Sequence, residues 1–175
     1  GYVGLVLLEH HTDALDHVVI SGVTAAPMPN RIFLKPQLGL LSVLFKQRWF
    51  ANMQAKALPL TPEERQAFTE NLLATSMTAY RRIYEEAADF VVSPALRQIN
   101  IPPLITAGGN EVDIITRAVG IIAGMMPNAD GRLAPGLGHG WNVEAPSLFN
   151  AMIRAWITDA PLPPQLQAAS GSRTH

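Results

Sequence analysis

The sequence predicts an α/β fold, in which helices flank a parallel β-sheet and an all-helical segment interrupts it. Two short apolar runs, at 16–22 and 103–108, end in glycine, as strands buried on both faces commonly do. Helical patterns separate them, and residues 31–98 carry little strand signal. Strands that alternate with helices form parallel sheets through right-handed crossovers.

The composition is that of one ordinary globular domain. The chain has 175 residues, of which 48% are hydrophobic and 15% are charged, so disorder across the whole chain is not expected. The formal net charge is −1, and Lys and Arg are scattered, so no basic stripe predicts nucleic-acid binding. There are no cysteines, which excludes disulfides, cysteine zinc sites and a cysteine nucleophile.

The amino-terminal residues suggest a fragment. Residues 1–8 are apolar but far too short to span a bilayer, and they lack the basic start and cleavage site of a signal peptide. Because the chain begins without Met and inside an apolar segment, we expect it to be part of a longer protein. The compartment stays open, with the cytoplasm favoured, and the oligomeric state is not predicted.

In the first part of the chain, residues 2–11 are apolar on most sides and predict a helix packed on the sheet. The strand at 16–22 follows, and then a Pro- and Ala-rich loop at 23–30. The insert at 31–98 is expected to be entirely helical. It contains a strong helix start at Thr61-Pro-Glu-Glu64, with a capping Thr, a Pro at the first helical position and a Glu that closes a capping box.

The second part returns to strands. After 103–108, a helix is expected from about 113 to 126, and a weak strand at 132–135 leads into a glycine-rich loop. A last helix opens at Pro146. We therefore expect a core made of residues 1–30 and 99–158. The Pro-, Gln-, Ala- and Ser-rich residues 159–175 are expected to form a disordered tail.

Polar side chains follow two of the predicted strands. His139 stands between two glycines after the last strand, and Glu111 and Asp113 follow the strand at 103–108. The carboxyl ends of parallel strands share one sheet edge, so an acid and a histidine should meet there. A carboxylate that accepts the Nδ1 proton orients a catalytic histidine. Asp113 suits a helix cap before Ile114, so Glu111 is favoured as the acid and Asp113 is the alternative.

The other histidines carry less signal. His10, His11 and His17 are expected at helix ends or on the surface, and His175 ends the tail. Glu9 and the two histidines that follow it are adjacent, so a helix cannot turn all three toward one metal ion. Gly108-Gly109 lacks the Lys-Ser/Thr of a phosphate loop. We therefore predict neither a metal nor a cofactor.

A nucleophile is missing from this pattern. No Gly-x-Ser-x-Gly occurs in the chain. Ser21 follows a strand but lacks the preceding glycine, and the remaining serines fall in predicted helices, caps or the tail.

From Gly1 to about residue 158, the chain resembles the carboxyl-terminal half of an α/β-hydrolase. The stretch Pro103-Leu-Ile-Thr-Ala-Gly-Gly-Asn-Glu111 resembles the strand and acid loop of that family. Residues 127–139 resemble its last strand and histidine loop, and Glu144-Ala-Pro146 resembles the start of its final helix. The insert at 31–98 stands where the family carries its lid.

The resemblance implies a nucleophile–acid–histidine triad with His139 as general base and Glu111 as the orienting acid, although the family more often has Asp there. Gly1-Tyr-Val-Gly4 resembles the residues just past the nucleophile elbow, so the nucleophile would precede Gly1. The chain alone is then expected to be inactive. It is also expected to be poorly soluble, because its first strand would lack a neighbour.

The implied activity is hydrolysis of an ester-like substrate by a serine nucleophile. Apolar residues in the insert, at 38–50 and at Met77, Tyr80 and Tyr84, suggest a small or medium hydrophobic substrate. Relatives of this fold use the same scaffold for dehalogenation, epoxide opening, carbon–carbon hydrolysis or peroxidation, and these reactions stay open. The alternative is a non-catalytic module of the same fold that binds a ligand or partner.

Overall fold

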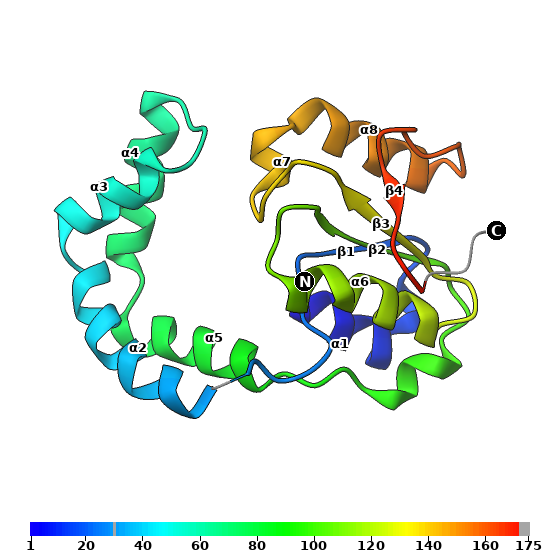
Figure 1. Ribbon diagram of the computed structural model, residues 1–175, viewed down its shortest axis with the longest axis horizontal. Helices are drawn as coiled ribbons and strands as arrows, with labels where there is room; N and C mark the ends of the chain where they lie inside the picture. The colour runs from blue at the N-terminus through cyan, green and yellow to red at the C-terminus, as the bar shows by residue number, and fades with distance from the viewer. Residues whose placement is uncertain (30, 172–175) are drawn as a thin grey trace. The chain divides into compact units, whose positions relative to one another are not determined.

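The computed structural model describes residues 1–29 and 31–171, and it divides into two compact units (Figure 1). Unit 1 comprises Gly1–Ala26 and Phe90–His175, and unit 2 comprises Pro27–Asp89. The helical unit therefore ends nine residues earlier than the 31–98 insert expected from the sequence, 98 − 89 = 9. Val92 and Leu96 explain the difference, because both are buried in the core of unit 1.

Unit 1 is built on a sheet in the order β1-β2-β3-β4, with β1 Val18–Ser21, β2 Pro103–Gly108, β3 Asp130–Ala134 and β4 Gln167–Ala168. β1, β2 and β3 are parallel, as predicted, and β4 is antiparallel to β3. The α/β class is thus confirmed, and the three parallel strands lie within two residues of their predicted positions.

The tail differs from the prediction of disorder. Residues 159–171 form a turn followed by β4, and the backbone N–H of Ala169 donates to the carbonyl of Gly131 at 2.9 Å. Leu166 and Ala169 are 5% and 4% exposed. The tail is rich in Pro, Gln, Ala and Ser, but the apolar side chains of Leu166 and Ala169 reach the core, and the chain pairs with β3. The rest of the predicted tail, including His175, lies outside the described residues.

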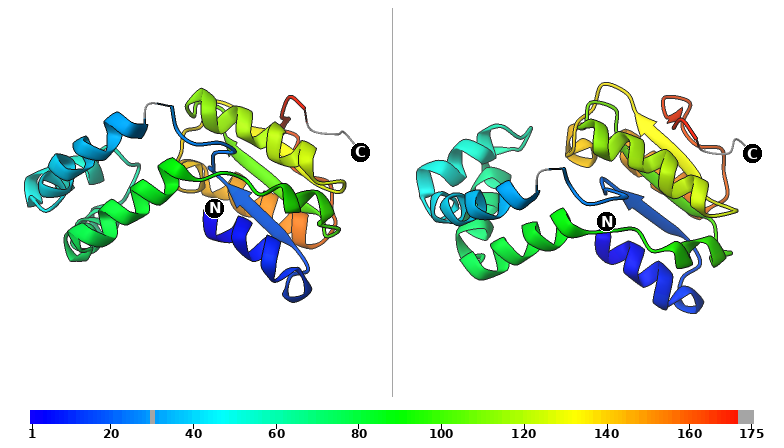
Figure 2. Two further views of the ribbon diagram at one scale, coloured as in Figure 1. Left: turned by 90° about the horizontal axis from the view of Figure 1, so that it is seen from below. Right: turned by 60° about the horizontal axis from the view of Figure 1, so that its bottom comes forward.

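Two hydrophobic clusters cover the two faces of the sheet. The helices α1 Tyr2–His10 and α6 Asp113–Met125 pack on one face, and α7 Trp141–Glu144 and α8 Pro146–Ile157 pack on the other (Figure 2). Adjacent residues of β2 serve opposite faces, as the period of a strand requires: Ile105 belongs to the first cluster and Leu104 to the second. Short 3₁₀ helices at Thr12–Ala14 and Pro94–Gln98 complete unit 1.

Unit 2 consists of four described helices: α2 Arg31–Phe45, α3 Arg48–Lys56, α4 Pro62–Ala74 and α5 Met77–Asp89. The predicted capping box at the start of α4 is confirmed, because the Thr61 hydroxyl accepts from the Glu64 N–H while the Thr61 N–H donates to the Glu64 carboxylate.

Aromatic rings link three of these helices. Phe45 of α2 contacts Phe50 of α3 and Tyr80 of α5, with ring centroids 5.2 and 4.2 Å apart, and Tyr80 continues to Tyr84 at 4.5 Å. The apolar segment at 38–50 and the Tyr80–Tyr84 stripe thus meet in one cluster. Burial raises the pKa of the Tyr80 phenol well above its ordinary value.

Candidate active site

An acid and a histidine meet at the carboxyl edge of the sheet. Glu111 follows β2 and His139 follows β3, and the Nδ1 of His139 lies 2.5 Å from the Oε1 of Glu111. The Glu111 side chain is only 6% exposed, whereas that of His139 is 72% exposed. With the proton on Nδ1, the imidazole donates to the carboxylate. Nε2 is then the ring nitrogen that can exchange a proton with another group.

The backbones of the two loops interlock, which fixes this approach. The Gly109 N–H donates to the Ala134 carbonyl at 2.7 Å. The Asn110 N–H donates to the Leu137 carbonyl at 2.9 Å, and the Asn110 side-chain amide donates to the Gly136 carbonyl at 2.9 Å. Parallel pairing of β2 and β3 brings the loops together, and these three hydrogen bonds hold one against the other.

Two glycines lie where the backbone passes close to the histidine loop. A Cβ on Gly108 would lie 2.2 Å from the Gly138 carbonyl oxygen, so only glycine lets the two loops meet. Gly22, just after β1, has a φ of +66°. A Cβ there would lie 3.1 Å from the Cε1 of His139 and 3.6 Å from the Oε1 of Glu111. The end of a third strand thus packs against the acid–histidine pair.

Asp113, the alternative acid, lies elsewhere. It is the first residue of α6, its side chain is 85% exposed, and it forms an ion pair with Arg117 at 3.0 Å. It is a first-turn carboxylate rather than the cap expected from the sequence, because Val112 holds the N-cap position and no side chain caps the helix.

The remaining described histidines lie apart from the acid–histidine pair. His10 ends α1, and His11 caps it. The Nε2 of His17 lies 3.5 Å from the carboxylate of Asp159. None of the three is buried.

No described hydroxyl stands in the place of a nucleophile. The Ser21 oxygen accepts a hydrogen bond from the indole N–H of Trp141 at 3.1 Å, and the Ser93 hydroxyl donates to Glu9 at 2.7 Å. Within the described part of the chain, Glu111 is the hydrogen-bonding partner of the His139 side chain, and no serine or threonine hydroxyl bonds to it.

Two contacts to the histidine loop escape sequence reasoning. The Glu144 carboxylate accepts from the Gly138 N–H at 3.1 Å, and Trp141 donates to Ser21, which is 120 residues away along the chain. In the sequence, Trp141 and Glu144 only precede the last predicted helix, and no pattern indicates what they contact. A hydrogen bond across so long a separation carries no local signal.

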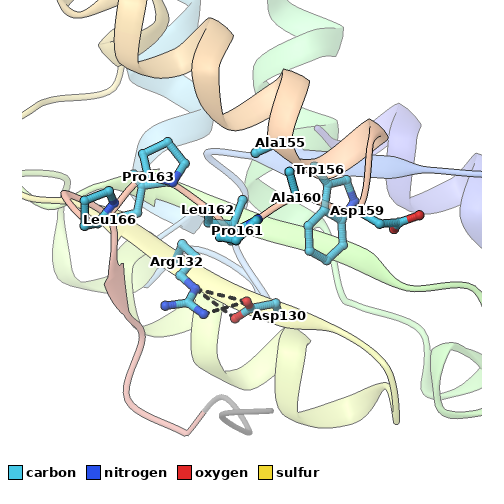
Figure 3. Close-up of a pocket in the computed structure, with 11 residues that line it drawn as sticks. Asp130, Arg132, Ala155, Trp156, Asp159, Ala160, Pro161, Leu162, Pro163 and Leu166 are labelled. Atoms are coloured by element: carbon cyan, nitrogen blue, oxygen red, sulfur yellow. Dashed lines mark hydrogen bonds and ion pairs between the residues drawn. The ribbon is translucent and has the colours of Figure 1, made fainter.

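A pocket of about 770 Å³ lies beside β3, α8 and the segment that follows α8 (Figure 3). Asp130 and Arg132 of β3 line it and point toward one another, joined by hydrogen bonds of 2.8–3.0 Å. Asp130 is the first residue of β3, whereas His139 follows the last, so this pocket is separate from the acid–histidine pair.

Within residues 1–29 and 31–171, no group of three or more His, Asp or Glu side chains could hold a metal ion. No helix in that part of the chain combines the length and apolar character needed to cross a membrane.

Known proteins resemble this chain over part of their length. No family model matches it. It is 26% identical over 169 residues to the "Putative carbamate hydrolase RutD" of Caulobacter sp. (strain K31), a match that covers 90% of the chain and 62% of that protein.

Solved structures also match most of this chain but only part of their own length. The α/β hydrolase MGS-M2, from a Medee basin deep-sea metagenome library, superposes with a TM-score of 0.69 at 16% identity, covering 94% of this chain and 64% of that one. A thermophilic esterase from Thermogutta terrifontis gives a TM-score of 0.66 at 17% identity, with 90% and 61% covered. The chain therefore spans a little over three fifths of the length of these relatives. It has the α/β-hydrolase fold and corresponds to the carboxyl-terminal part of that fold.

Proposed function

We propose that this chain contributes the acid and the histidine of a hydrolase triad that acts on ester-like substrates. The observation that carries the proposal is the 2.5 Å contact between Glu111 and the Nδ1 of His139. That contact leaves Nε2 as the base, and the 72% exposure of the His139 side chain leaves room for a nucleophile and a substrate beside it. The nucleophile, which we take to be a serine hydroxyl, belongs to a part of the protein outside this sequence.

In the first half-reaction, the oxygen of the nucleophile bonds to the substrate carbonyl carbon while Nε2 of His139 takes the proton from that oxygen. The carboxylate of Glu111 accepts a hydrogen bond from Nδ1–H and stabilises the imidazolium that forms. The imidazolium then protonates the leaving alkoxide as the carbon–oxygen bond breaks. In the second half-reaction, a water molecule bonds to the acyl carbon while Nε2 of His139 takes one of its protons. The bond between that carbon and the nucleophile's oxygen then breaks, the imidazolium protonates this oxygen, and the carboxylic acid product leaves.

The relatives support this class of reaction. RutD is named for hydrolysis of a carbamate, and the Thermogutta terrifontis protein is named an esterase. Both reactions attack a carbonyl carbon that bears a heteroatom leaving group. For the substrate we propose a small or medium hydrophobic ester or carbamate. The hydrophobic character is proposed from the apolar and aromatic composition of the insert, in which Trp49 and Tyr84 are 61% and 46% exposed.

The proposal is tested by ester hydrolysis with the intact protein that contains this chain. We expect His139→Ala to lower kcat by about 10³-fold or more, because the general base is lost. Glu111→Gln should lower it by roughly 10²- to 10⁴-fold, because the amide does not stabilise the imidazolium in the same way. Asp113→Asn is the matched control and should keep full turnover. Wild-type turnover by His139→Ala would refute the proposal.

A non-catalytic binding module is the second candidate. It is favoured by one observation, that no described hydroxyl bonds to His139. A fluorophosphonate probe separates the two, since it forms a covalent bond only with an activated nucleophile. Labelling of the intact protein that disappears in His139→Ala supports the hydrolase. A protein that binds hydrophobic esters, but neither labels nor hydrolyses them, is a binding module.

A further inference from the structure

Besides the contacts from Glu111 and Asn110, two side-chain hydrogen bonds flank His139 within its loop. On one side, the Gly138 N–H donates to the Oε2 of Glu144 at 3.1 Å. On the other side, the Trp141 indole N–H donates to the Ser21 hydroxyl at 3.1 Å. The residue directly before His139 and the second residue after it are therefore both anchored.

The Trp141 anchor is buried. The residue is 1% exposed, and its ring packs edge-on against Phe149 with centroids 4.7 Å apart. A buried indole N–H needs an acceptor, and the Ser21 hydroxyl supplies it. Ser21 is the last residue of β1, and Gly22 packs against the imidazole. The end of β1 thus meets the histidine loop at two points.

The Glu144 anchor is set by a short helix. α7 has four residues, and the N–H groups of Val143 and Glu144 both donate to the Gly140 carbonyl, at 2.8 and 3.0 Å. This turn directs the Glu144 side chain back onto Gly138. A Cβ added to Gly138 would lie 3.1 Å from the Oε1 of Glu144. No described Lys or Arg forms an ion pair with Glu144. Its carboxylate accepts a hydrogen bond from the Gly138 N–H of the loop.

We infer that Glu144 and the Ser21–Trp141 pair are positioning residues, which hold His139 so that Nδ1 faces Glu111 and Nε2 faces the nucleophile. The inference rests on the proposed function and adds residues that act through the position of His139. Such residues affect the geometry of the proton transfer rather than the affinity for substrate. Their loss should therefore lower kcat and leave KM nearly unchanged.

The Glu144 arm is tested in the intact protein with three variants. Glu144→Ala removes the acceptor and should lower kcat by about 10- to 100-fold, the scale of a misplaced catalytic group. Glu144→Gln keeps a carbonyl oxygen and should recover most of that loss. Asn142→Ala changes an exposed residue of the same short helix and serves as the matched control. Equal kcat in Glu144→Ala and Asn142→Ala would overturn this arm.

The Ser21–Trp141 arm is tested by a double-mutant cycle. Ser21→Ala and Trp141→Phe delete the same hydrogen bond from opposite ends, and the phenyl ring keeps most of the packing. Each should lower kcat, and the double variant should lose clearly less than the product of the two single losses. Losses that multiply would show that the two residues act independently and would overturn this arm.

A signal that needs no turnover separates the inference from the proposed function. A short Nδ1–H···Oε1 bond gives a low-field proton resonance in the NMR spectrum, which should vanish in His139→Ala. Weakening or loss of that resonance in a folded Glu144→Ala protein would support positioning even if no ester were hydrolysed. An unchanged resonance in Glu144→Ala, Ser21→Ala and Trp141→Phe would overturn the inference even if the hydrolase proposal held.

Discussion

Substitution of Gly22 by alanine perturbs the acid–histidine pair from the side of β1. The φ of Gly22 is +66°, a conformation that residues with a Cβ adopt only at a cost in free energy. The new methyl group would lie 3.1 Å from the Cε1 and 3.4 Å from the Nδ1 of His139. The variant therefore combines backbone strain with pressure on the imidazole ring.

The size of the effect follows from these distances. Left-handed backbone costs an alanine about 1–2 kcal/mol of folding free energy. Carbon atoms in ordinary contact lie about 3.5–4.0 Å apart, so the ring must move by roughly 0.4 Å or more from its 3.1 Å approach. A 1 Å misplacement can cost about 10²-fold in rate. Half that displacement corresponds to roughly a tenfold loss, or about 1.4 kcal/mol.

Gly136→Ala is the matched comparison. Its φ is +76°, but a Cβ there would meet no heavy atom within 4 Å. Urea unfolding of the two intact variants should show similar losses of stability, because both have left-handed backbone. Ester hydrolysis should then show a loss of kcat about tenfold greater for Gly22→Ala, in line with the displacement of the ring. Equal kcat values for two equally stable variants would show that the methyl group on residue 22 does not displace the imidazole ring.

Three further predictions concern stability. Thr61→Ala should lower the free energy of unfolding by about 1 kcal/mol, because the hydroxyl that accepts from Glu64 is lost, and Thr61→Ser should restore it in urea unfolding. Gly108→Ala should fail to accumulate as folded protein by circular dichroism, since its Cβ would lie 2.2 Å from the Gly138 carbonyl oxygen, and a wild-type spectrum and melting curve would contradict this. The raised pKa of Tyr80 stabilises the fold below the unfolded pKa of about 10, and this contribution is lost as pH rises above it. Tyr80→Phe should therefore flatten the alkaline fall in melting temperature, and an unchanged fall would refute the assignment.

Much of the fold could be predicted because its signals are local. The runs at 16–22 and 103–108 carry strand patterns, and the Thr61–Glu64 start carries its own capping chemistry. Glu111 and His139 could be placed at one sheet edge because parallel strands put their carboxyl ends together. Their roles in catalysis stay a prediction for the experiments above.

Local sequence patterns therefore predicted the α/β class, the helical character of the insert and the approach of an acid loop to a histidine loop. Three features appear only in the folded chain: residues 90–98 join the sheet unit, β4 forms in a Pro-, Gln- and Ala-rich segment, and Ser21 meets Trp141 across 120 residues. The difference arises from the separation along the chain over which each interaction acts. Periodicity, capping and turn chemistry act within a few residues, whereas packing and long-range hydrogen bonds arise only once distant segments are brought together in the fold.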